Sequence, residues 1–165
     1  MNLSEAATLA DRYAQSGLER ELAVLRSEWS DEIEAAARDA DYRVRGQAYR
    51  AIAQFRFRQK IELLRRGLED ESPAARGSAL ISLEGLSRNH PGDVNAFRPL
   101  LHNLAAKDGN VAVRRLAILC LKNGSAARES IQLLDGIAGD DDEDREVRSS
   151  ARSVALFLTR KSRQK

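Results

Sequence analysis

The sequence predicts an all-α fold, an α-solenoid of stacked antiparallel helix pairs. One short motif, called the signature motif below, recurs four times, as Val44-Arg45-x-x-Ala48, Ala75-Arg76-x-x-Ala79, Val113-Arg114-x-x-Ala117 and Val147-Arg148-x-x-Ala151. The copies begin 31, 38 and 34 residues apart, which is a period typical of helical repeats. Composition agrees, because aromatic residues make up 5% of the 165 residues and only 3 are Pro, as in helix-rich proteins.

Apolar residues spaced three and four apart predict helices along the chain. The first two, at about 3–14 and 18–29, form an expected N-terminal capping pair. Ser30-Asp31 resembles the N-cap of a short separate helix that ends at Arg38. Further helices are expected at 42–57, 59–68, 73–86 and 93–106, followed by one ending at Lys122. Asn123-Gly124-Ser125 is expected to cap the next helix, which ends at Ile137, and the last helix is expected at 145–160. We therefore expect one domain over residues 1–165, with capping helices at 3–29, repeats at 30–160 and a frayed basic tail at 161–165.

Each position of the signature motif has a physical role in stacking. The Ala gives a small contact where helices approach closely, and the Val or Ala four residues earlier lies on the same stripe. The Arg lies near the helix start, where it can reach a carboxylate in its own turn or in the next repeat's turn. An acidic stretch precedes every copy. Because an exposed ion pair contributes only about 0–1 kcal/mol, apolar packing must supply most of the stability.

The pattern Asp-x-x-x-x-Val-Arg-x-x-Ala at Asp39 to Ala48 resembles HEAT repeats of the short, bacterial-style subtype. The resemblance covers about residues 30–160 and implies a right-handed solenoid of about four repeats, whose second helices line a concave face. Members of that family serve as scaffolds, inhibitors, nucleic-acid binders or lyase subunits. The second copy departs from the pattern, because Ala75 replaces the usual Val and Gly77 follows the Arg.

The residues indicate no catalytic set, so we expect neither an enzyme nor a cofactor. His90 and His102 have no Cys or His partner at metal-ligand spacing, and no glycine-rich phosphate loop is present. The net charge of +2 identifies no partner. No apolar run reaches the length of a membrane span and no leader pattern opens the chain, so we expect a cytoplasmic protein that does not bind membranes.

Two surfaces are candidates for binding a partner. The first is the outward side of the helices that carry the signature motif, where Tyr49 and Arg50 form the expected anchor, since Tyr and Arg are enriched at interfaces. The residues expected on it are Tyr42, Tyr49, Arg50, Ala53, Leu80, Ile81, Glu84, Arg115, Ile118, Lys122, Arg152 and Leu156. The second is the acidic run, defined as Asp140, Asp141, Asp142, Glu143 and Asp144. It is either a solvated loop that caps a helix or an anionic patch for a basic partner or a divalent ion.

These features favour a non-enzymatic module that binds another protein. The resemblance suggests a specific form, a bacterial immunity protein that neutralises a nuclease toxin, with the acidic run occupying the toxin's basic cleft. The alternative is a nucleic-acid binder similar to HEAT-like DNA glycosylases, for which the Arg-rich span 38–66 argues. Several of those Arg fall on different helical faces, which makes nucleic acid the less favoured partner. A scaffold or helper subunit for chromophore attachment is a third possibility.

Overall fold

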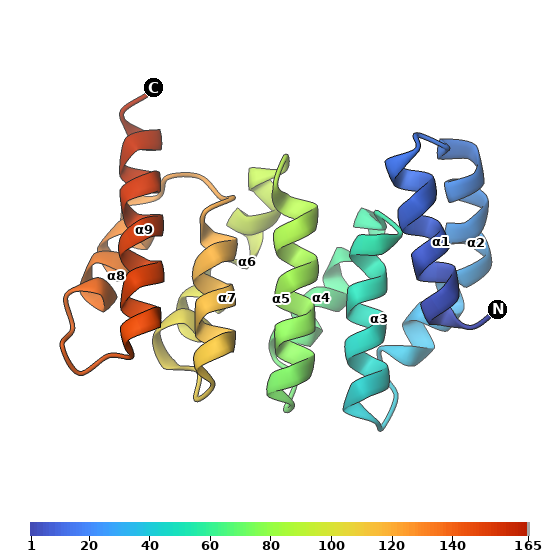
Figure 1. The fold of residues 1–165 in the computed structure, drawn as a ribbon, viewed down its shortest axis with the longest axis horizontal. Helices are drawn as coiled ribbons and strands as arrows, with labels where there is room; N and C mark the ends of the chain where they lie inside the picture. The colour runs from blue at the N-terminus through green and yellow to red at the C-terminus, as the bar shows by residue number, and fades with distance from the viewer. Residues whose placement is uncertain (165) are drawn as a thin grey trace. The chain divides into compact units, whose positions relative to one another are not determined.

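The computed structural model describes residues 1–164, and all regular secondary structure over that range is helical (Figure 1). The helices are α1 (Leu3–Gln15), α2 (Glu19–Ala36), α3 (Tyr42–Gln54), a 3-10 helix (Arg58–Lys60), α4 (Ile61–Leu68), α5 (Pro73–Ser87), α6 (Pro91–Lys107), α7 (Val111–Leu121), α8 (Arg128–Ala138) and α9 (Arg145–Ser162). We call α3, α5, α7 and α9 the signature helices, because each contains one copy of the motif. The predicted all-α fold is confirmed.

The chain forms two compact units, the N-terminal unit Met1–Leu86 and the C-terminal unit Ser87–Lys165. In the N-terminal unit, α1 and α3 pack on each other and on α2, and α4 packs on α3. In the C-terminal unit, α7 packs on α6 and α9 packs on α8, while α7 and α9 also lie side by side (Figure 1). Each unit is thus a stack of helix pairs, with its signature helices in one layer. The single domain expected over residues 1–165 stays a prediction.

The signature alanines lie where the helices meet. Ala48, Ala79, Ala117 and Ala151 all have 0% of their surface exposed. In the N-terminal unit, α4 approaches so closely that a Cβ added to Gly67 would lie 2.6 Å from the Cβ of Ala79. Larger buried side chains fill the remaining space, and each stabilises the fold by about 1.5–3 kcal/mol. The predicted role of the alanines is confirmed.

The short separate helix predicted to end at Arg38 does not exist, because α2 continues without a break from Glu19 to Ala36. Ser30 is half-buried and Asp31 is exposed, so their side chains can stay hydrated inside a helix and need not cap its start. Leu22, Leu25 and Ile33 are all buried, which keeps one apolar stripe in register along α2. The boundary at residue 30 between capping helices and repeats therefore falls inside a helix.

Helix α3 ends at Gln54, three residues earlier than predicted, because Arg56 has a left-handed backbone with φ of 50°. The carbonyl groups left open there are bound by a side chain from α2. Arg26 Nε donates to the carbonyl of Phe55 at 2.8 Å, and Arg26 Nη2 donates to the carbonyl of Arg56 at 3.0 Å. A long-range contact thus compensates for the strained residue and the early end of the helix.

Two boundaries in the C-terminal unit also differ from expectation. Helix α8 begins at Arg128 rather than next to Ser125, because Ser125 is held by α6. The amide of Asn95 donates to Ser125 Oγ at 2.8 Å and its oxygen accepts from Ser125 N at 3.0 Å. Helix α9 extends through Ser162, so the start of the predicted basic tail is helical, while Lys165 lies outside the described residues.

Candidate functional site

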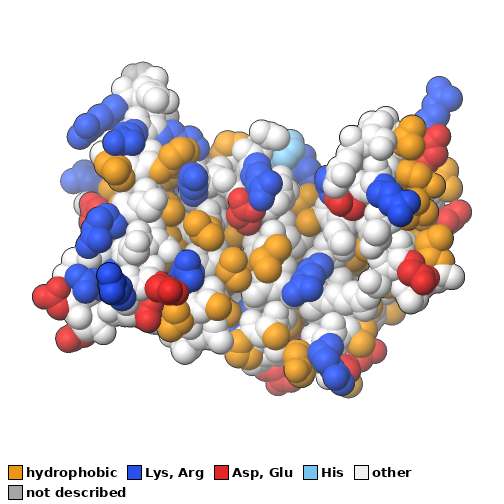
Figure 2. Space-filling view, viewed as in Figure 1, with side chains coloured by type: hydrophobic (Ala, Val, Ile, Leu, Met, Phe, Trp, Pro, Cys, Tyr) orange, Lys and Arg blue, Asp and Glu red, His pale blue; other side chains and the backbone are white. Residues whose placement is uncertain are grey.

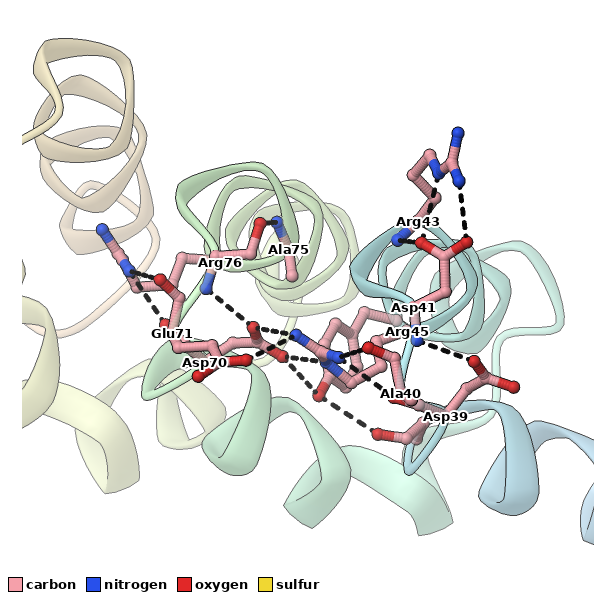
Figure 3. A network of polar contacts seen from close by, with 12 residues as sticks. Asp39, Ala40, Asp41, Arg43, Arg45, Asp70, Glu71, Ala75 and Arg76 are labelled. Carbon is pink, nitrogen blue, oxygen red and sulfur yellow. Dashed lines mark hydrogen bonds and ion pairs between the residues drawn. The ribbon is translucent and has the colours of Figure 1, made fainter.

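The turn before α5 is tied to α3 by a buried Arg–carboxylate bridge (Figure 3). Arg45 Nε and Nη2 donate to the two oxygens of Asp70 at 2.8 and 2.9 Å. Arg45 Nη1 also donates to the carbonyls of Asp39 and Ala40, both at 3.0 Å. The Asp70 side chain is only 5% exposed, and the hydrogen bond from Arg45 holds the pKa of its carboxyl below the ordinary value. The bridge therefore fastens both neighbouring turns to one guanidinium.

The C-terminal unit repeats this arrangement at the third copy of the motif. Arg114 donates to both oxygens of Glu143 through its two terminal nitrogens, and its Nε donates to the carbonyl of Ala105 at 3.0 Å. These hydrogen bonds lower the pKa of the Glu143 carboxyl. The predicted contact between a signature Arg and the next turn is thus present in each unit. Arg76 donates to the carbonyl of Asp70 at 2.8 Å, within its own turn.

The acidic run serves mainly to build the start of α9. Asp144 caps that helix, accepting from the backbone nitrogens of Glu146 at 2.9 Å and Val147 at 3.0 Å. Glu143 is bound by Arg114 and only 14% exposed, so most of its side chain is covered, and its role in contacting a partner stays a prediction. Asp140, Asp141 and Asp142 are exposed. Asp144 is also exposed, so these four carboxylates are the part of the run that a partner could reach. Among them, Asp141 accepts a hydrogen bond from Arg148 Nη2 at 3.3 Å.

Tyr49, the expected anchor of the outward side, is fully buried, so that prediction is wrong. Its hydroxyl donates to Asp70 Oδ2, 3.3 Å away, and burial raises the pKa of the phenol. Of the equivalent residues directly after the other signature alanines, Leu80 and Ile118 also have 0% exposure, whereas Arg152 is exposed. Large side chains that recur at one position of the repeat indicate a core position. That recurrence was the available sign that Tyr49 faces inward.

Most of the other residues predicted on the outward side do reach solvent. Tyr42, Arg50, Ile81, Lys122, Arg152 and Leu156 are exposed, and Ala53, Glu84 and Arg115 are half-buried. Arg115 Nη1 donates to Glu146 at 2.9 Å. In the N-terminal unit, Tyr42 and Arg50 border a largely polar cavity of about 440 Å³, which is also lined by Ser4, Arg43, Gly46, Gln47, Gln54, Ala74 and Ser78.

The C-terminal unit has a different hollow between its two signature helices, which we call the α7–α9 groove. It encloses about 440 Å³ and is lined by Leu119, Lys122, Ser149, Ser150, Ser153, Val154, Leu156, Phe157 and Arg160. Leu119, Leu156 and Phe157 are 40%, 51% and 42% exposed. The Nζ of Lys122 lies 4.8 Å from the centroid of the Phe157 ring, a cation–π contact. The groove therefore combines large apolar side chains with basic ones.

The sequence pattern does not single out Leu119, Phe157 or Arg160 as binding residues. The available signal is the apolar run Leu156-Phe157-Leu158 on a helix with one buried face. An amphipathic helix buries a single stripe, so three consecutive large apolar residues exceed what its core side can hold. Leu158 is buried while its two neighbours are not. When an apolar run has more large residues than the buried stripe can hold, some of them must lie at the surface.

The described residues offer one contact of a type used in catalysis. His102 Nε2 lies 2.8 Å from Ser130 Oγ, and burial, with a contribution from the charge of Arg98, lowers the pKa of His102. Ser130 is 2% exposed, so its hydroxyl is closed to a substrate and joins α6 to α8 instead. No group of three His, Cys, Asp or Glu among residues 1–164 is placed to hold a metal ion.

Comparison with known proteins points to one family. A family model described as HEAT repeats matches residues 30–103, a segment that begins within α2 and ends within α6. No curated protein matches the chain. Within residues 1–164, no helix has both the length and the apolar character needed to cross a bilayer.

Proposed function

This chain belongs to the HEAT-repeat family through residues 30–103, and we propose that it is a non-enzymatic module that binds another protein. Stacked helical repeats generally present extended surfaces to protein partners. The observation that carries the proposal is the α7–α9 groove, where Leu119, Leu156 and Phe157 stay exposed together. Clustered apolar side chains bordered by polar ones are typical of protein interfaces.

A more specific form of this function is inhibition of a partner enzyme, as by an immunity protein that blocks a nuclease toxin. Asp140, Asp141 and Asp142 remain exposed in the loop before α9. Three adjacent carboxylates would speed association with a basic cleft through electrostatic attraction. Glu143 adds less to that charge because it is covered and bound by Arg114, and the exposed Asp144 also caps α9.

Nucleic acid is the less favoured partner because carboxylates neutralise much of the Arg-rich span. The pairs are Arg38–Glu34, Arg43–Asp41, Arg45–Asp70, Arg56–Asp11 and Arg65–Glu62. A guanidinium that already binds a carboxylate contributes little free energy to binding a phosphate, because it must first give up that carboxylate. Tight binding to a duplex requires several free cations that release counterions together.

The test is affinity capture with the tagged full chain from its native cells, followed by reconstitution with the purified partner. We expect one protein to form a complex of defined stoichiometry, measured by light scattering after gel filtration. Replacing Asp140, Asp141 and Asp142 together by Asn should slow association if the partner presents a basic cleft. Generic duplex DNA should bind weakly, with an affinity that falls steeply with salt. A chain that binds DNA tightly and captures no protein would overturn the proposal.

A further inference from the structure

We infer that the α7–α9 groove binds an acidic amphipathic helix of a partner protein. The partner helix would place large apolar side chains against Leu156 and Phe157 and carboxylates near Lys122 and Arg160. This inference deepens the proposed function and rests on it, because it assigns the contact surface and the chemistry of the partner.

The exposed apolar side chains of the groove, Leu119, Leu156 and Phe157, lie outside the buried core of the unit. Helix α9 already buries a complete stripe, formed by Val147, Ala151, Val154, Ala155 and Leu158. Leu156 and Phe157 lie outside that stripe, and Leu119 lies outside the buried stripe of α7. Exposing such side chains is unfavourable in water, so a partner that covers them gains hydrophobic stabilisation.

The charges around the groove select an acidic partner. Lys122 and Arg160 both line it, and among the described residues no ion pair joins either of them to a carboxylate. The described residues that line the groove include no Asp or Glu, and Glu146 in the first turn of α9 is bound by Arg115. Figure 2 shows basic and hydrophobic side chains next to one another over the upper part of α9, and acidic ones mainly near its lower end. A segment with carboxylates is attracted there and a basic segment is repelled.

The shape of the groove suits a helix better than a nucleic acid. Two neighbouring helices form its walls, and Ser149, Ser150 and Ser153 supply small side chains along one of them. An amphipathic helix that lies in such a groove inserts side chains spaced three and four residues apart. Among the described residues of the lining, Phe157 has the one aromatic ring, and Leu119 and Leu156 beside it are aliphatic, so the groove lacks the successive aromatic rings on which the bases of a single strand stack. A protein helix is therefore the occupant that these residues favour.

The experiment uses the full chain and two labelled probe peptides of about 14 residues, or about four helical turns. One peptide carries Leu and Phe on one face and Glu on the other, and the second has Lys in place of every Glu. Binding is measured by fluorescence polarisation. We expect the wild-type chain to bind the Glu peptide and to bind the Lys peptide at least about tenfold more weakly.

Two pairs of variants separate the groove from the rest of the surface. Leu156→Ser with Phe157→Ser should weaken the Glu peptide about tenfold or more, whereas Val24→Ser, an exposed apolar position of α2, should not. Lys122→Glu with Arg160→Glu should reverse the preference between the two peptides. Arg128→Glu, which changes an exposed cation at the start of α8, should leave it unchanged. All replaced residues are exposed, so urea unfolding should show that every variant folds.

Other results would overturn the inference. Equal binding of both peptides, or equal effects of groove and control variants, would show that the groove does not recognise an acidic helix. Displacement of the Glu peptide by generic duplex DNA would identify a nucleic-acid site instead. If a captured natural partner binds the Leu156/Phe157 variant as tightly as the wild type, the groove assignment is wrong while protein binding stands. Failure to capture any protein would instead count against the proposed function.

Discussion

Arg45 in the N-terminal unit and Arg114 in the C-terminal unit hold the same position of the signature motif, yet their carboxylate partners are held differently. Asp70 also accepts hydrogen bonds from the Tyr49 hydroxyl at 3.3 Å and from the backbone nitrogen of Ser72 at 2.9 Å. Glu143 has one further bond, from the neighbouring nitrogen of Asp144 at 3.0 Å. The first bridge is therefore connected to the core through an aromatic side chain, and the second is part of a loop.

The residue after the signature Ala accounts for this difference. Tyr49 and Ile118 occupy the same repeat position and are both fully buried. Only Tyr49 has a hydroxyl that can reach a carboxylate. At the same repeat position, Tyr49 both packs in the core and binds the turn through its hydroxyl, whereas Ile118 only packs in the core. Five tests follow from this difference, beginning with the largest expected effect.

Tyr49→Ala should destabilise the N-terminal unit by about 3–5 kcal/mol, because it removes a large buried ring and one partner of Asp70. Tyr49→Phe keeps the ring and should cost about 1 kcal/mol. Urea unfolding, combined with hydrogen exchange of peptides from each unit, measures both values. Equal stabilities for the Ala and Phe variants would contradict the buried position of the ring.

Arg45→Leu should cost about 3 kcal/mol or more, since it leaves the nearly inaccessible Asp70 carboxylate without its cation. Arg114→Leu should cost about 1–2 kcal/mol, because Glu143 lies in a loop beside exposed residues and can turn toward water. The same unfolding measurement compares the two. A larger loss for Arg114→Leu would reverse our ranking of the bridges.

A double-mutant cycle makes this comparison sharper. Combining Arg45→Leu with Tyr49→Phe should give a non-additive change, because both residues bind Asp70. Combining Arg114→Leu with Ile118→Val should give an additive change, since the Ile118 side chain has no polar atom to share with Glu143. Additivity in both cycles would show that Tyr49 and the bridge are energetically independent.

Gly67→Ala should destabilise the N-terminal unit by about 1–3 kcal/mol through overpacking. The new Cβ would lie 2.6 Å from Ala79 and 3.2 Å from the Tyr49 ring, so α4 must move away. Gly136→Ala in α8 is the matched control, because nothing lies within 4 Å of its added Cβ. That change should be stabilising by about 0.5–1 kcal/mol, as for other helical glycines. Thermal unfolding should therefore show shifts of opposite sign.

Lowering the pH should weaken both ion pairs, and we expect this to change stability less than the substitutions above. The pKa values of Asp70 and Glu143 lie below their ordinary values of 3.8 and 4.5. Their contribution to stability is thus complete above those ordinary values and is lost as pH falls through the lowered ones. Asp70→Asn should flatten the acid dependence of the N-terminal unit, and Glu143→Gln that of the C-terminal unit. Hydrogen exchange measured across the acid range would show an unchanged slope if the bridges do not contribute.

Much of the fold follows from the period of the signature motif. The repeated Ala positions predict close contacts, and all four are buried. The continuity of α2 does not follow, because Ser and Asp favour a helix start unless the surrounding stripe stays buried. The contact surface follows only in part. Lys122 and Leu156, which the sequence places on the outward side, are exposed and line the groove. Phe157 also lines it, but it belongs to an apolar run that periodicity alone does not assign to the surface.

Local periodicity and side-chain size were enough to specify helices, their pairing and the inward alanines, because these depend on residues three or four positions apart. Three features depend on residues distant in the chain. The hydroxyl of Tyr49 reaches Asp70, 21 positions away, Arg114 binds Glu143, 29 positions away, and Leu119 and Phe157 line one groove from different helices. Packing of whole helices brings such residues together. The packing of the helices in the tertiary structure therefore decides which side chains stay exposed to a partner.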